Sequence, residues 1–261
     1  MSRMHLVELH DLAACPPLVR RYLTDVLEGV GNLSPAPYRA FVPRLRAALA
    51  ATGEHELLDL CSGSGGPLPT LLRLLAADGG PPITARLTDL RPHWTDETRA
   101  RLAPHGITVH PTPVDATAVP SDLAGFRLIC NGFHHFRPDQ ARAILADAVR
   151  CRRGIAIFEA FGRSWAHLLA GALFWLPTLA VTPWLRPFRW SRLLLTYVLP
   201  AVPIVASLDG IVSALRVYSP KELRALVAKI EGADTYEWQA TRLRVGWLPA
   251  HVTVLIGVPR S

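Results

Sequence analysis

An acid and a glycine-rich turn follow an apolar run near residue 60, in an order that suits binding of a polar ligand. The segment 56–66 reads ELLDLCSGSGG and places Asp59 ahead of Gly63 and Gly65. Glycine lets the backbone approach a ligand because it carries no Cβ. The free N–H groups at the start of the next helix can then donate to polar ligand atoms. Many nucleotide-binding folds use such a turn, so its meaning depends on the residues downstream.

Further polar residues follow later apolar runs: Asp89, Asp115 and Asn131. The carboxyl ends of parallel strands meet at one edge of a sheet, where ligands bind, so we expect these side chains to lie near Asp59. An acid after the second strand can accept hydrogen bonds from both hydroxyls of a ribose. An acid after the third, followed by the small Ala116, can bind an adenine amino group. The distance from Asp59 to Asp89 exceeds the roughly 20 residues of a dinucleotide fingerprint.

Alternating strands and helices must position these residues. We expect strands at 57–60, 83–88, 107–110 with 113–114, 126–131 and 155–158, and helices at 68–77, 93–103 and 138–150. Such units predict an α/β fold with a parallel sheet covered by helices on both faces. Before them, 16–51 is expected to be helical with a break at 29–37. After residue 218, a helix at 220–230 and strands at 236–245 and 251–258 are expected to complete the sheet.

The expected domains are an N-terminal helical cap (1–52), a core (53–161), a hydrophobic insertion (162–218) and a C-terminal helix with two strands (219–261). Half of the 261 residues are hydrophobic and 19% are charged, which is too polar for a polytopic membrane protein. The net charge of +7 comes from dispersed arginines without a basic helix, so we expect no nucleic-acid partner.

The four cysteines are far apart and form no C-x-x-C pair, which predicts reduced thiols, no metal site and a cytoplasmic protein. The N-terminus has charges among its apolar residues, so we expect no secretory signal. The sequence does not indicate an oligomeric state.

Residues 57–160 resemble the class I S-adenosylmethionine-dependent methyltransferases. LLDLCSGSG is similar to the glycine-rich first motif of that family, Asp89 to its ribose-binding acid, and Val114-Asp115-Ala116 to its adenine-contacting motif. Asn131-Gly132-Phe133-His134-His135-Phe136 resembles the segment beneath the methionine portion of the cofactor. Cys61 departs from the family, which usually has a glycine there. The resemblance implies a Rossmann-like seven-stranded sheet and S-adenosyl-L-methionine held by Asp59, Cys61, Ser62, Gly63, Ser64, Gly65, Asp89, Leu90, Asp115, Ala116, Asn131 and Phe133.

In methyl transfer the cofactor provides the electrophile, and the protein positions the acceptor, excludes water and removes a proton from a hydroxyl acceptor. His134, His135 and Glu159 are the candidate catalytic residues. One imidazole is a candidate base near neutral pH. The alternative is structural: one histidine bonds the backbone, the other packs against the cofactor, and Glu159 caps a helix.

The insertion is strongly apolar. Residues 164–185 and 193–208 contain no Asp, Glu, Lys or Arg, and three arginines lie between them. The first stretch is long enough to cross a bilayer, but Pro177 and Pro183 interrupt it, and a hairpin would put the arginines on the wrong side. A buried lid and a membrane-docking surface stay as equal alternatives. Within the insertion, the candidate acceptor-binding residues are Trp165, Arg189, Arg192, Tyr197 and Asp209.

By resemblance, segments before the first strand and after the fifth enclose the acceptor, and an apolar lining selects an apolar molecule. The whole arrangement also resembles a group of bacterial methyltransferase-like proteins with the same apolar insertion. The leading hypothesis is a methyltransferase, by default an O-methyltransferase, acting on a hydrophobic small-molecule or lipid-like acceptor. It is expected in the cytoplasm, either free or peripheral on the inner face of the cell membrane. The alternatives are a same-fold enzyme that uses S-adenosylmethionine for cyclisation or rearrangement, and a silent membrane-associated adaptor.

Overall fold

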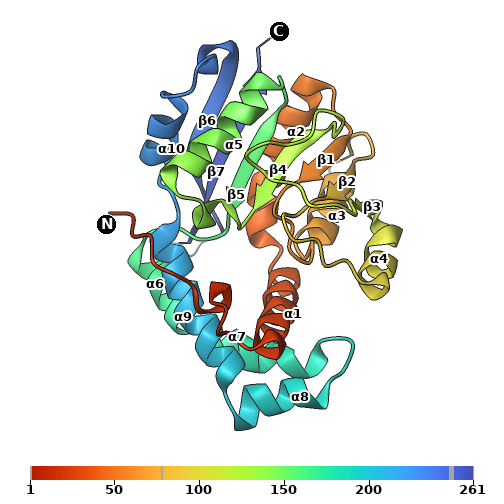
Figure 1. Ribbon diagram of the computed structural model, residues 1–261, viewed down its shortest axis with the longest axis vertical. Coiled ribbons are helices and arrows are strands. Elements are labelled where there is room, and N and C mark those ends of the chain that lie inside the picture. The colour runs from red at the N-terminus through yellow and green to blue at the C-terminus, as the bar shows by residue number, and fades with distance from the viewer. Residues whose placement is uncertain (1, 78, 247–249, 261) are drawn as a thin grey trace. The chain divides into compact units, whose positions relative to one another are not determined.

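The computed structural model describes residues 2–77, 79–246 and 250–260. The chain forms two compact units (Figure 1): unit 1 comprises Met1–Pro35 and Phe161–Val217, and unit 2 comprises Ala36–Ala160 and Tyr218–Ser261. The expected helical cap over 1–52 is therefore divided. Its second helix, α2 (Ala36–Thr52), belongs to unit 2 because it packs against a sheet strand and against the helix that follows the glycine turn.

Within the described residues of unit 2, seven strands form one sheet in the order β3-β2-β1-β4-β5-β7-β6. Strands β1 to β5 run parallel, and β7 is antiparallel to both β5 and β6. The expected strand–helix alternation is confirmed, but the last two strands make the sheet mixed. A short connection joins β6 to β7, and parallel neighbours would need a long crossover. The strands are β1 Glu56–Asp59, β2 Thr84–Leu87, β3 Ile107–Val109, β4 Phe126–Cys130, β5 Ile155–Glu159, β6 Tyr236–Arg244 and β7 His251–Pro259.

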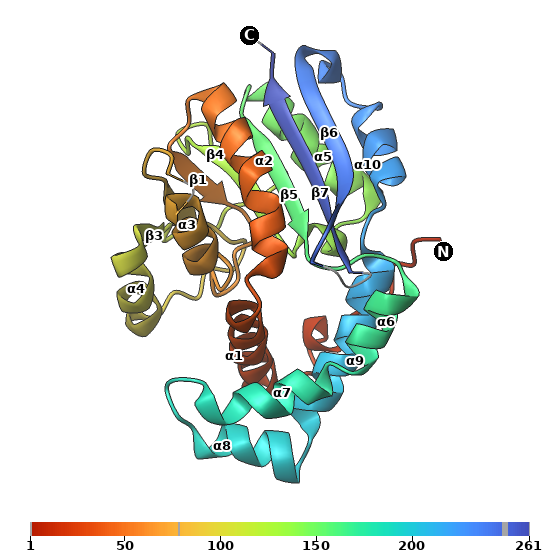
Figure 2. The same cartoon turned by 180° about the vertical axis from the view of Figure 1, so that it is seen from behind.

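Helices cover both faces of this sheet. Helices α5 (Pro138–Arg150) and α10 (Pro220–Val227) lie in front of it in Figure 1, whereas α2 and α3 (Leu68–Ala77) lie in front of it in Figure 2. Each face has its own apolar core, with β-strand side chains alternating between the two. Local signals begin the helices: Ser219 and Glu222 form a capping box at α10, and Thr95 caps α4 (Asp96–Leu102).

One expected break is narrower than its predicted range, and one expected strand is absent. The break expected over 29–37 is confined to residues 34 and 35: α1 (Pro17–Leu33) continues through Gly29, which packs closely against Leu185 and Val181, and α2 begins at Ala36. The expected strand at 113–114 is absent from the described residues; two prolines there lack the N–H groups that a ladder requires. Val114 still donates from its backbone N–H to the carbonyl oxygen of Asp89 at 2.9 Å.

Unit 1 is helical. It contains α1, α6 (Trp165–Ala172), α7 (Trp175–Val181), the short α8 (Trp190–Leu193), a π-helical turn over Leu194–Val198, and α9 (Ala201–Arg216). Its core joins α1 to α7 and α9 through Tyr22, Val26, Val181 and Val202. In the described part of the chain, no single helix is long and apolar enough to cross a bilayer, and two bent helix pairs satisfy those criteria only when each pair is taken together.

Candidate active site

The carboxyl ends of the parallel strands bring the predicted polar residues together. Asp59 ends β1 and pairs with Leu87 of β2 and Leu128 of β4. Asn131 directly follows β4, and Glu159 ends the adjacent strand β5. Thus residues separated by as much as 100 positions in sequence share one edge of the sheet, as the spacing predicts.

Asp59 is a buried carboxylate with an unfilled position. Only 3% of its surface is exposed, and its Oδ1 atom has no hydrogen-bond partner among the described residues. Its pKa is raised to about 7, mainly by burial and to a smaller extent by the nearby Asp89, while a hydrogen bond with Ser62 opposes the rise. An unpaired buried carboxylate is costly, so this position favours a cation or a hydrogen-bond donor supplied by a ligand.

The glycine turn is held rigidly against β2. Ser62 donates from its backbone N–H to the Thr88 carbonyl oxygen (3.0 Å) and from its hydroxyl to that of Asp59 (2.8 Å). Gly63 has a φ of +53°, and a Cβ added there would meet open space. Gly65 has a φ of +72°, and a Cβ there would collide with Leu87. The two glycines therefore have different surroundings: Gly63 borders open space that a ligand can enter, and Gly65 packs against the sheet.

Asp89 holds the turn from the second strand. Its Oδ2 atom accepts a hydrogen bond from the Gly63 N–H at 3.0 Å, and its Oδ1 atom accepts one from the Arg91 N–H at 2.8 Å. Its neighbour Leu90 is exposed, whereas Ser64 accepts a hydrogen bond from Arg101 through its carbonyl oxygen. One carboxylate thus fixes the position of the ligand-facing glycine.

Cys61 adopts a left-handed backbone with a φ of +59°. L residues with a Cβ are strained in this region, which explains why a glycine suits the position. A Cβ placed on Gly132 would lie 3.7 Å from the Cys61 Cβ, and burial raises the pKa of the Cys61 thiol well above its usual range. The side chain is therefore a packed thiol beside the loop after β4.

Replacing Cys61 with glycine should relieve this backbone strain. We expect Cys61→Gly to be more stable than Cys61→Ala by about 1 kcal/mol, because both variants lack the thiol and only alanine retains the Cβ. Urea unfolding of the two variants measures the difference. Cys151→Gly and Cys151→Ala are the control pair, since the φ of Cys151 is negative. Equal stability of the two Cys61 variants would contradict the strain.

Asp115 and Ala116 lie in the loop after β3. Asp115 is exposed, and its Oδ1 atom accepts hydrogen bonds from the backbone N–H (2.8 Å) and hydroxyl (2.7 Å) of Thr117. Ala116 is buried. The pairing of Val114 with Asp89 brings this loop next to the end of β2. The structure therefore places Asp115 near Asp89. Both hydrogen bonds from Thr117 go to the Oδ1 atom of Asp115, and neither goes to its Oδ2 atom.

Asn131 shapes the loop after β4. It has a φ of +53°, and its Oδ1 atom accepts a hydrogen bond from the Ala160 N–H at 2.7 Å. Phe133 is only 1% exposed and packs against Tyr218, with ring centroids 5.6 Å apart. The Phe133 side chain is therefore a core residue that supports the loop and leaves almost no surface for the cofactor contact expected of it.

His134 and Glu159 form a buried pair. Glu159 accepts two hydrogen bonds from His134: one from its backbone N–H to Oε1 at 2.9 Å and one from Nδ1 to Oε2 at 2.8 Å. Each residue is 3% exposed. A carboxylate on Nδ1 selects the tautomer whose Nε2 atom carries the lone pair. His135 is half-buried, and its ring lies 4.4 Å from that of His134, centroid to centroid.

Tyr38 is a site residue that the sequence analysis missed. It lies on α2 and packs against Phe158 in a tilted arrangement, with 5.2 Å between the ring centroids. Burial raises the pKa of its phenol well above the ordinary value, and a hydrogen bond with the Asn131 side chain opposes that rise. The only signal in sequence is its place on the buried face of α2 with Phe41 and Leu45.

The five candidate acceptor-binding residues all lie in unit 1, and two of them have internal partners. Arg192 is 1% exposed and donates to Asp25 (2.8 Å) and to two backbone carbonyls. Asp209 is 4% exposed and accepts from both the backbone N–H and Nδ1 of His10. These contacts fasten α8 to α1 and the N-terminal segment to α9, so we correct both assignments to structural roles.

The remaining candidates in unit 1 are more accessible. Trp165 is exposed on α6, and Arg189 is half-buried before α8. Tyr197 donates from its hydroxyl to the Leu179 carbonyl oxygen at 2.5 Å and lines a pocket. Of the five, Tyr197 alone is among the residues that line that pocket.

Comparison with known proteins identifies the architecture. No family model and no curated protein matches the sequence. Among solved structures, the plantazolicin methyltransferase BpumL in complex with SAH is 11% identical, with a TM-score of 0.53 over 94% of this chain and 92% of that chain. The methyltransferase domain of bacterial CtHen1-CN is 10% identical, with a TM-score of 0.51 over 85% of this chain and 99% of that chain.

The mitomycin 7-O-methyltransferase MmcR is 17% identical, with a TM-score of 0.47 over 88% of this chain. This chain spans about half the length of MmcR and of other O-methyltransferases that it matches, 54% and 56% in two cases. At these identities the likeness concerns the fold. The expected fold class is confirmed: the chain has the Rossmann-like α/β fold of a class I methyltransferase.

Proposed function

We propose that this protein is an S-adenosylmethionine-dependent methyltransferase that transfers a methyl group, by default to oxygen, on a hydrophobic small-molecule or lipid-like acceptor. The observation that carries the proposal is the turn between Asp59 and Gly65 fastened by Asp89. Gly63 in this turn faces open space and is held by Asp89, and the unpartnered Oδ1 atom of Asp59 lies at the end of β1, just before the turn.

The residues present fit this cofactor. S-adenosylmethionine carries an ammonium group, a ribose and an adenine, and when bound it supplies an electrophilic methyl group on a sulfonium. Asp59 offers a buried carboxylate to the ammonium, which would lower a pKa that burial has raised to about 7. Asp89 would accept from the ribose hydroxyls, and Asp115 would accept from the adenine amino group.

The histidines of the loop after β4, His134 and His135, are the groups that would remove a proton from a hydroxyl acceptor. Glu159 orients the His134 ring and holds its proton on Nδ1. His135 is the more accessible of the two imidazoles. One of them serves as the general base, for which a pKa near neutral is suitable. An apolar acceptor suits the insertion, since it brings few polar groups that would need partners.

Binding of the cofactor can be tested without knowing the acceptor. We expect calorimetry to show micromolar binding of S-adenosylmethionine and of its demethylated product, and Asp89→Ala to weaken both by at least about tenfold, because a charge-assisted acceptor and the anchor of Gly63 are lost together. Asp139→Ala is the matched control, because the Asp139 side chain is 87% exposed on α5. Absence of binding to the unmodified protein would refute the proposal.

Transfer of the methyl group needs a second readout. Methyl-labelled cofactor incubated with a lipid extract should yield a labelled product that partitions into organic solvent. A protein that binds the cofactor but leaves the label on it with every extract tested would contradict methyl transfer while leaving cofactor binding intact. The chemical identity of the labelled product then names the acceptor.

A further inference from the structure

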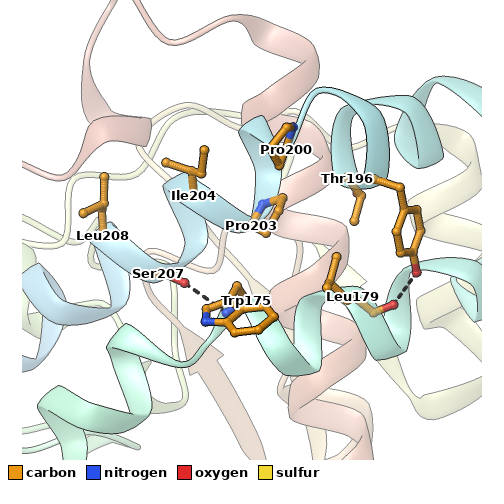
Figure 3. Close-up of a pocket in the computed structure, with 9 residues that line it drawn as sticks. Trp175, Leu179, Thr196, Pro200, Pro203, Ile204, Ser207 and Leu208 are labelled. Carbon is orange, nitrogen blue, oxygen red and sulfur yellow. Dashed lines mark hydrogen bonds between the residues drawn. The ribbon is translucent and has the colours of Figure 1, made fainter.

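Unit 1 contains an apolar groove of about 500 Å³. Trp175 and Leu179 of α7 form one wall, and Ile204 and Leu208 of α9 form the other (Figure 3). Tyr197 of the π-helical turn also lines the groove. The Trp175 backbone N–H donates to the Ser207 hydroxyl at 3.0 Å, which joins the two helices across the groove. Its volume is within the range of small-molecule sites.

Exposed apolar side chains also lie on α6, which packs against α9. Trp165 and Leu169 of α6 and Leu173, which follows it, are spaced four residues apart, which places them on one helical face. Two of the groove residues, Ile204 and Leu208, are themselves 52% and 47% exposed. Single apolar residues are ordinary on a protein surface, but many exposed apolar side chains on neighbouring helices favour a site of interaction.

The charge of this region restricts what can cover it. Residues 160–208 contain no Asp or Glu. Of their four arginines, Arg192 is buried in an ion pair with Asp25, and Arg163 and Arg189 are half-buried. Arg186 is exposed, and Trp184 and Trp190, which flank it in sequence, are each 78% exposed. Tryptophan concentrates at the interface between lipid and water, and arginine binds lipid phosphates, so this combination fits an anionic bilayer better than a protein surface.

One polar atom within the groove is unsatisfied. Thr196 lines the groove and is 1% exposed, and its Oγ1 atom has no hydrogen-bond partner among the described residues. A buried hydroxyl without a partner costs free energy, which a ligand oxygen would recover. The ester group of a glycerophospholipid carries such an oxygen next to a hydrocarbon chain.

We infer that the exposed surface of α6, α7 and α9 docks on an anionic phospholipid bilayer, with the groove admitting a hydrocarbon chain of a bilayer lipid. The helices lie in the interface and present their apolar faces to the lipid, while Arg186 contacts phosphate. This inference does not rest on methyl transfer, because every residue that carries it belongs to unit 1.

Flotation with vesicles tests the docking. We expect the protein to float with phosphatidylcholine vesicles that contain phosphatidylglycerol, and less with phosphatidylcholine alone or at high salt. The double variant Ile204→Glu/Leu208→Glu should lower the floated fraction about tenfold, because two apolar contacts become charges on the lipid side. Leu33→Glu is the control, since Leu33 is 72% exposed in unit 1 outside this surface. Equal melting temperatures of the variants would show that each is folded.

Four outcomes would overturn the inference. The protein could remain at the bottom of the gradient with both kinds of vesicle, or Leu33→Glu could lose as much flotation as the double variant. Light scattering could instead show twice the monomer mass, reduced to the monomer by the double variant, in which case a second copy covers the surface. Resistance to extraction with alkaline carbonate would contradict docking at the interface.

Discussion

Asp59→Asn is expected to stabilise the ligand-free protein by up to about 4 kcal/mol at pH 8 and to change its stability little at pH 4. Burial raises the Asp59 pKa from 3.8 to about 7, and each pH unit of that difference corresponds to about 1.4 kcal/mol. Between pH 3.8 and about pH 7, the folded state therefore keeps the Asp59 proton that the unfolded state has already released. Stability falls as the pH rises through this window, and the loss is complete above pH 7. Asparagine removes the charge and hence the loss.

Urea unfolding at pH 4 and pH 8 measures this effect. Asp139→Asn is the control, because Asp139 is exposed on α5 and should change stability little at either pH. Asp59→Asn could instead change the free energy of unfolding by the same amount at both pH values. That result would show that the charge of Asp59 is not the cause. The same substitution should weaken binding of S-adenosylmethionine, because it removes the carboxylate offered to the ammonium group.

Such opposite effects on stability and binding are common at ligand sites. A charge held without a partner destabilises the free protein, and the ligand that supplies the partner recovers that free energy on binding. The unpartnered Oδ1 atom of Asp59 is thus more informative than its sequence context alone.

The cofactor side of the site could be predicted because its determinants are local. Asp59 and Asp89 each follow an apolar run, Gly63 lies in the turn after the first run, and the topology of a parallel sheet brings strand ends together. The positive φ of Gly63 follows from the same local pattern. Residues whose role depends on packing were beyond reach: Tyr38 contacts Asn131 only because α2 folds onto the sheet.

In the insertion, too, roles that depend on long-range packing could not be predicted from the sequence. Arg192 and Asp209 are polar residues in an apolar segment, and that contrast indicated ligand contacts. Their actual partners, Asp25 on α1 and His10 in the N-terminal segment, are 167 and 199 residues away in sequence. Gly29 likewise resembles a helix breaker, whereas it is a close contact with Leu185. Spacing along the chain carries no information on such long-range pairs.

Substitution of Glu159 should lower stability, whereas substitution of Asp59 should raise it, although both residues are buried carboxylates at one edge of the sheet. Both Glu159 oxygens accept hydrogen bonds from His134. We expect Glu159→Ala to lower the free energy of unfolding by about 3 kcal/mol or more, because truncation leaves a buried backbone N–H and a buried Nδ1–H without their acceptor. Glu237→Ala, on the exposed face of β6, is the control and should change stability little.

Glu159→Gln separates the two hydrogen bonds. Its amide oxygen can still accept from the His134 N–H, but its NH₂ group then faces Nδ1, which must accept and so moves the ring proton to Nε2. We therefore expect Glu159→Gln to retain more stability than Glu159→Ala. If His134 is the base, the glutamine variant should also slow methyl transfer by about a hundredfold, because the lone pair is on the wrong nitrogen, while cofactor binding is unchanged. Unaltered transfer in this variant would leave His135 as the base and Glu159 as a support for the loop.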